Sequence, residues 1–275
     1  SWTIAYPAPA TEFALCYPYG LDEVRTLVRK SKHYWTMGTI GLSQEGRRIL
    51  RVSSTVDRDT SHPGIYLVAR QHAGETPGSW LLDGMLQHFS RTHESRVAVW
   101  TVPLADVGGL ERGRYGRGGP NDLDQTWGTP PLRYETRAIQ TDIAEWQIRT
   151  AAALVLNLEA GGGSEHEGIY ALLPGGDGAD PLARDAEKWA NVLSKALGDE
   201  YAAEDFKRTR EVATVPFGLP LDAYARQSLG ISALTLVAPY ALCGKTVMTP
   251  KQYREAGRRI ARAVVQRVLE KGARA

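Results

Sequence analysis

The sequence has few cysteines, little net charge and no long apolar run, and each shortage excludes a class of protein. Only two cysteines, Cys16 and Cys243, occur among 275 residues, and neither has a Cys or His partner at zinc-finger spacing. A disulfide framework and a Cys-based metal site are therefore not indicated. The 33 Lys and Arg residues nearly balance the 31 Asp and Glu residues, so nucleic acid is not expected as a partner.

Long apolar stretches are also missing. No run of about 18 or more apolar residues occurs, and the first residues lack a basic segment followed by an apolar one. The sequence thus predicts neither a membrane span nor a secretion signal, and we expect a cytoplasmic protein with no membrane partner. With 43% apolar and 23% charged residues, the composition is that of an ordinary globular protein with one sizeable core.

What the sequence does contain is an alternation of short apolar runs with longer amphipathic stretches. The short runs are nearly continuous in Val, Ile and Leu, as in strands that are covered on both faces. These predicted strands occupy 64–70, 96–103, 152–158 and 232–238. The predicted helices occupy 77–89, 132–149, 180–197, 219–229 and 249–271. This order is typical of an α/β fold around a mixed, mostly parallel sheet.

The beginning of the chain has a different pattern. Two alternating segments, WTMGTIGLS and RRILRVSS, flank a turn-like Gln-Glu-Gly at 44–46, which predicts an antiparallel pair of strands. We therefore expect a short β-rich N-terminal region, 1–60, that packs onto an α/β domain, 61–275.

The strongest chemical signal is a His and a Glu directly after the first predicted strand of the α/β domain. His72 and Glu75 lie in RQHAGETPGSWLLDGML, between that strand and an amphipathic helix. At a strand's carboxyl end, an imidazole nitrogen and a carboxylate oxygen can both turn toward one metal ion. The same spacing also fits a carboxylate that stabilises the helix N-terminus beside a histidine that only hydrogen-bonds within the loop.

The segment around His72 and Glu75 resembles the zinc-binding segment of the zinc carboxypeptidases, in particular their cytosolic-carboxypeptidase-like branch. FALCYPYG and IGLSQEGRRI resemble that branch's N-terminal β region, and VPLADVGGLERGRYGRGGPNDLDQTW resembles the loop that ends in the family's Asp-Leu-Asn-Arg motif. The similarity extends from about Phe13 to Lys271. It implies a three-layer α/β/α sandwich with an eight-stranded mixed sheet, and one zinc ion as cofactor.

The resemblance also implies a third zinc ligand, which in the family is a His. The residue at the matching position, after the predicted strand 152–158, is Glu159. One imidazole and two carboxylates would leave zinc less electrophilic, and its bound water less acidic, than a His-Glu-His set. His166 is the alternative third ligand if the glycine-rich loop before it folds back. Otherwise we expect His166 to bind substrate near the entrance of the site.

Positions that bind substrate in the family are altered as well. The Asp-Leu-Asn-Arg motif reads Asp-Leu-Asp-Gln at 122–125. Gln125 lacks the guanidinium that would bind a terminal carboxylate, and Asp124 adds a negative charge at the same place. The arginine that stabilises the oxyanion in the family is matched by Arg117, with Arg114 as an alternative that could also contact substrate.

The proton-transferring Glu of the family is expected in a late strand, in a segment similar to ALTLE. This chain reads ALTLV, with Val237 at the position of the acid, and no residue in 231–240 is acidic. A general base of this kind contributes on the order of 100-fold to 10,000-fold in rate. The carboxylates that remain as candidates for the base are Glu159, Glu165 and Glu167.

Two principal functions follow. The resemblance implies a zinc-dependent hydrolase of peptide or small amide bonds whose remodelled site accepts a substrate without a free terminal carboxylate. The alternative is a catalytically impaired pseudoenzyme of the same fold, which binds a ligand or a protein. A purely structural protein is the third hypothesis.

Overall fold

The fold is defined by a computed structural model, which describes residues 14–55, 62–115, 122–128, 130, 133–162, 166–173, 180–210 and 218–272. The strands are β1 Trp35–Leu42, β2 Arg48–Ser54, β3 Pro63–Ala69, β4 Ala98–Val102, β5 Ala151–Ala160, β6 Ile169–Leu173, β7 Ala202–Thr209, β8 Ala233–Ala238, β9 Leu242–Cys243 and β10 Thr246–Val247. The helices are α1 Leu21–Lys30, α2 Thr76–Thr92, α3 Val107–Glu111, the 3-10 turn η1 Leu123–Gln125, α4 Tyr134–Arg149, α5 Pro181–Tyr201, α6 Leu221–Leu229 and α7 Pro250–Gly272.

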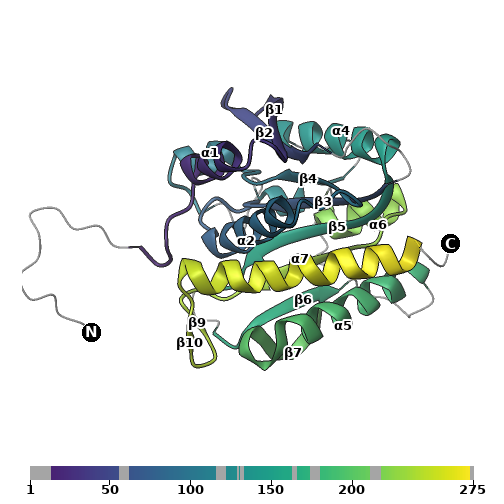
Figure 1. Ribbon diagram of the computed structural model, residues 1–275. Helices are drawn as coiled ribbons and strands as arrows, with labels where there is room; N and C mark the ends of the chain where they lie inside the picture. The colour runs from purple at the N-terminus through teal and green to yellow at the C-terminus, as the bar shows by residue number, and fades with distance from the viewer. Residues whose placement is uncertain are drawn as a thin grey trace, which may run out of the picture.

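Eight of these strands form one mixed sheet, in the order β1-β2-β4-β3-β5-β8-β6-β7. Helices α2, α5 and α7 cover one face of the sheet, and α4 and α6 cover the other (Figure 1). The three-layer α/β/α architecture with a mixed sheet, expected from the sequence, is therefore confirmed. Among the described residues, no helix is both long enough and apolar enough to cross a membrane.

The predicted strands and helices of the α/β domain are all present. The predictions missed α1, β6 and β7 and the short elements α3, η1, β9 and β10. Strand β7 reads AAEDFKRT and lies at the edge of the sheet, with most of its side chains exposed or half-buried. It therefore lacks the continuous apolar run of a strand that is covered on both faces. Helix α1 is mostly polar and buries only Val24 and Leu27.

The predicted antiparallel pair near the beginning of the chain is also present. Strands β1 and β2 pair from Trp35 opposite Ser54 to Leu42 opposite Arg48. Strand β2 also pairs with β4, so the two strands extend the central sheet. The division at residue 60 stays a prediction.

Three neighbouring parallel strands position the candidate site. Strand β5 pairs in parallel with β3 on one side and with β8 on the other. The carboxyl ends of all three therefore meet at one edge of the sheet, where α/β proteins usually bind ligands. His72 follows β3, Glu159 is near the end of β5, and Val237 lies opposite Glu159 on β8.

Helices α2 and α7 approach each other closely on one face of this sheet. A Cβ atom added at Gly84 would lie 2.2 Å from the carbonyl oxygen of Arg254, and one added at Gly257 would lie 2.0 Å from that of Leu81. Because backbone atoms cannot move aside cheaply, only glycine permits this contact at either position.

We expect Gly84→Ala and Gly257→Ala each to lower the free energy of unfolding by about 1–3 kcal/mol, because both overpack the contact between the two helices. Urea denaturation measures this directly. Gly38→Ala is the control, since a Cβ there meets no atom within 4 Å, and we expect a change within about 0.5 kcal/mol. Equal effects at all three positions would contradict the close-packing explanation.

Candidate metal centre

Three side chains predicted as metal ligands lie together at the carboxyl edge of the sheet. His72, Glu75 and Glu159 each offer a nitrogen or oxygen atom, and these atoms all lie within 4.8 Å of one another. All three residues are buried, with exposed fractions of 2%, 1% and 1%. No second group of three His, Cys, Asp or Glu residues meets this condition within the described ranges. The cluster is therefore the candidate metal centre.

Hydrogen bonding fixes the orientation of the His72 ring. Its Nε2 atom lies 2.8 Å from Oδ1 of Asp122, and its Nδ1 atom lies 2.9 Å from Oε1 of Glu75. Asp122 is itself oriented, because the same Oδ1 accepts a hydrogen bond of 3.0 Å from the Asp124 amide. A carboxylate on the far ring nitrogen is the usual way in which a protein orients a metal-binding histidine. Nδ1 therefore faces Glu75.

The two glutamates are held in place by neighbouring groups of β5. Oε2 of Glu75 accepts a hydrogen bond of 2.9 Å from the Ala160 amide, and Oε1 of Glu159 accepts one of 2.6 Å from the side chain of Asn157. The first turn of α2 can approach β5 because residue 78 is glycine, where a Cβ would lie 2.4 Å from the Leu158 carbonyl oxygen.

Arg70 positions the loop that carries His72, a role that no sequence pattern indicates. It has a left-handed φ of 66°, a conformation that costs a non-glycine residue on the order of 1–3 kcal/mol. Its buried side chain donates hydrogen bonds of 2.7 Å to the Ala73 carbonyl and 2.8 Å to the Tyr19 carbonyl. Burial lowers the pKa of Arg70 to about 10. These bonds join the loop to the segment before α1.

The titration of the cluster reflects its excess of carboxylates. Burial, together with the charges of Asp124 and Glu75, raises the pKa of Glu159 to about 8. Burial lowers the pKa of His72, but its interactions with Asp122 and Glu75 outweigh this effect and raise that pKa to about 11. Without a metal ion, His72 and Glu159 therefore both tend to keep their protons, and these protons offset the negative charge of the buried carboxylates.

A second buried charge network adjoins the cluster, and its cation, Arg210, was also missed by sequence reasoning. Nη1 of Arg210 donates a hydrogen bond of 2.8 Å to Asp124, and Nη2 donates one of 2.9 Å to Thr235. The Nε atom lies 3.4 Å from Asp222. Asp124 also accepts a hydrogen bond of 3.2 Å from Gln71. The negative charge of Asp124, which the sequence presents without a partner, is therefore balanced.

The position of Arg210 explains why no sequence motif pointed to it. Arg210 directly follows the edge strand β7, and its side chain forms an ion pair with Asp124, which is far away in the sequence. Burial lowers its pKa, but the charges of Asp124 and Asp222 outweigh this effect and raise it. Arg210 thus stays a cation at physiological pH.

The remaining substrate-binding candidates lie in different surroundings. Gln125 is half-buried in η1, next to Asp124. His166 and Arg114 are both exposed, and His166 is not part of the three-residue cluster. Arg117 lies outside the described residues, so its predicted role stays a prediction.

The residues considered for the role of general base lie in different parts of the structure. Val237 is 1% exposed and packs with Tyr170 and Ala203. Glu167 is on the surface, in an ion pair with Arg208. Glu165 lies outside the described residues, and Glu159 is the one of the three predicted alternatives that the structure brings into the cluster.

No protein-family model and no curated protein sequence matches the chain. Solved structures do resemble it. A metallo-carboxypeptidase from Burkholderia cenocepacia has a TM-score of 0.72 at 15% identity, covering 91% of this chain and 69% of that one. A metallo-carboxypeptidase from Pseudomonas aeruginosa in complex with (2-guanidinoethylmercapto)succinic acid has a TM-score of 0.68 at 18% identity, covering 92% and 70%.

A third solved structure is similar as well. Carboxypeptidase A from Helicoverpa armigera has a TM-score of 0.64 at 17% identity, covering 92% of this chain and 72% of that one. The chain therefore has a metallo-carboxypeptidase-like fold. Its resemblance to the cytosolic branch stays a prediction.

We expect Arg210→Met to lower the free energy of unfolding by about 3–5 kcal/mol, because it leaves Asp124 and Asp222 as buried charges without their cation. Urea denaturation at neutral pH measures the loss. Adding Asp222→Asn to this variant should recover part of it. Arg149→Met, which removes an exposed ion pair with Glu145, is the control and should cost at most about 1 kcal/mol. A similar loss in both single variants would contradict a special role for the buried network.

Proposed function

We propose that the protein is a zinc-dependent hydrolase of peptide or amide bonds with a remodelled active site. The observation that carries this proposal is the buried cluster of His72, Glu75 and Glu159 at the carboxyl edge of a metallo-carboxypeptidase-like fold. Fold alone does not define an activity, so the proposal depends on what these residues can bind.

The donor set fits a divalent cation. It consists of one imidazole that is oriented by Asp122 and two carboxylates, all within reach of a single ion. Three protein ligands are the number found in catalytic zinc sites, which keep a further position for water or substrate. When bound, zinc would polarise a carbonyl group and lower the pKa of a water molecule. The chain's own contribution is to hold these donors in a buried site from which bulk water is largely excluded.

The surroundings of the cluster favour a substrate whose end group is neutral or carries an amine. The guanidinium of Arg210 is directed at Asp124, Asp222 and Thr235, so its charge is balanced within the protein. Gln125 supplies no charge. A terminal carboxylate would therefore meet a net negative network, and the charge-assisted bond that arginine usually provides would be missing.

Glu159 is a carboxylate beside the position that the family's general base would occupy. It lies opposite Val237 in the pairing of β5 with β8, and adjacent strands are about 4.8 Å apart. In the hydrolase that we propose, Glu159 accepts the proton that the glutamate at the position of Val237 would accept in the family. It would do so while contributing to the metal site.

A pseudoenzyme of the same fold is the second candidate, and Val237 is the observation that favours it. Its side chain is buried in an apolar contact with Tyr170 and Ala203, where a catalytic acid would need contact with water. In this alternative, the site binds a peptide or small amide and does not cleave it.

We expect protein purified without added metal to contain about one equivalent of zinc, measured by inductively coupled plasma mass spectrometry. His72→Ala and Glu75→Gln should reduce this to less than about a tenth of an equivalent, because each removes a ligand. Glu145→Gln is the control, since Glu145 is an exposed acid in a surface ion pair. Zinc that persists in both ligand variants would contradict the site.

A panel of neutral and amine-ended peptides and amides tests catalysis. We expect the unaltered protein, loaded with zinc, to hydrolyse members of this panel, and Glu159→Gln to slow the reaction by on the order of 100-fold or more. The double variant Val237→Glu, Gln125→Arg restores the family's residues, and Val237→Gln, Gln125→Arg is its control without a base. Activity that appears only in the variant with Glu at 237 would overturn the hydrolase proposal for these substrates and support the pseudoenzyme.

A further inference from the structure

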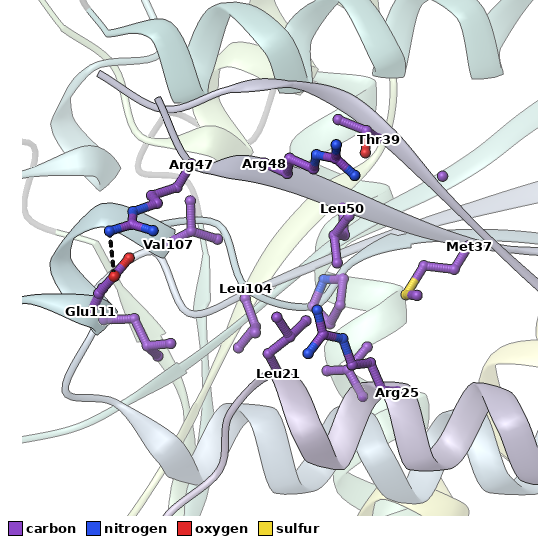
Figure 2. Close-up of a pocket in the computed structure, with 14 residues that line it drawn as sticks. Leu21, Arg25, Met37, Thr39, Arg47, Arg48, Leu50, Leu104, Val107 and Glu111 are labelled. Carbon is purple, nitrogen blue, oxygen red and sulfur yellow. Dashed lines mark ion pairs between the residues drawn. The ribbon is translucent and has the colours of Figure 1, made fainter. Parts of the chain in front are cut away.

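A cavity that shares no residue with the metal centre lies between α1 and the first two strands. Its volume is about 660 Å³, and its walls come from α1, β1, β2, α3 and the chain between β4 and α3. Figure 2 shows α1 below the two strands, with Leu50 pointing down and Leu21 pointing up into the space between them. We call this cavity the α1–β1 groove.

The groove has an apolar interior. Aliphatic side chains from four different parts of the fold surround it, and they include Leu21, Val24, Leu50, Leu104, Val107 and Leu110. On the β1 side, a Cβ atom added at Gly38 would meet no atom within 4 Å, so there is open space at this residue. Binding sites for small molecules have this character, with volumes of about 300–1,000 Å³ and few polar groups.

The lining also contains three arginines and one acid. Arg47 is bound to the acid, Glu111, in an ion pair that Figure 2 shows at one end of the groove. Arg25 lies 3.6 Å from Asp22, but both side chains are more than half exposed, and such pairs contribute little. Arg48 has no ion pair in the part of the chain that the structure describes. The guanidinium groups of Arg25 and Arg48 are therefore the ones that can bind a ligand.

We propose that the α1–β1 groove binds an unbranched fatty carboxylate. The hydrocarbon chain would lie along the aliphatic side chains, and its carboxylate would bind one of the two guanidinium groups, Arg25 on the helix side or Arg48 on the strand side, which Figure 2 shows on opposite sides of Leu50. A guanidinium matches a carboxylate in both charge and geometry, and burying the chain supplies the apolar part of the affinity. A second copy of this protein is a poor occupant, because it would bring two sets of arginines together.

Decanoate, kept below its micellar concentration, is the probe, and decyltrimethylammonium is the probe of opposite charge. We expect isothermal titration calorimetry of the unaltered protein to show saturable binding of decanoate with a Kd below about 1 mM. Arg25→Ala with Arg48→Ala should weaken binding by about tenfold or more, because it removes the charge-assisted bonds. Decyltrimethylammonium should bind at least about tenfold more weakly than decanoate.

Two further variants separate a specific site from loss of folding. Arg29→Ala, which removes a cation from the same helix but outside the groove, should leave the Kd unchanged. Leu50→Trp should fill the groove and abolish binding, while circular dichroism confirms that the variant is folded. Equal binding of the two probes, unchanged binding in the double arginine variant, or binding of an acidic peptide but not of decanoate would overturn the proposal.

Discussion

The parallel pairing of β3, β5 and β8 is the constraint on which the candidate site depends. Residues that lie far apart in the sequence reach one edge of the sheet because these three strands run side by side in the same direction. His72 and Glu75 come from the connection after β3, and Glu159 comes from the end of β5. Any slip of one residue in either pairing would turn Glu159 to the opposite face of the sheet and separate it from the other two.

Charge compensation is the second requirement, because a buried carboxylate is stable only with a partner. The structure meets it in two different ways at adjoining places. Asp124 and Asp222 have a permanent cation in Arg210. Glu75 and Glu159 share His72, a group that can lose its proton to admit a metal. This difference is consistent with a network of fixed charge beside a cluster that can exchange a proton for a metal ion.

The chain between β4 and the end of α3 contacts both the α1–β1 groove and the loop that carries His72. Its aliphatic residues line the α1–β1 groove. The amides of Ala105 and Asp106 also donate hydrogen bonds of 3.1 Å and 2.9 Å to the carbonyls of Ala69 and Arg70, directly before His72. The groove and the loop that carries the candidate ligands are therefore parts of one packed region.

By itself, the sequence determined the α/β class, the covered strands and the place of His72 and Glu75. It did so because continuous apolar runs and helical periodicity are local properties. The edge strand β7 and the cation Arg210 were decided only by the tertiary structure. An edge strand needs no apolar run, and an arginine carries no signal of a distant partner. Whether Asp124 is an isolated negative charge likewise depends on Arg210, which the tertiary structure brings within 2.8 Å of it.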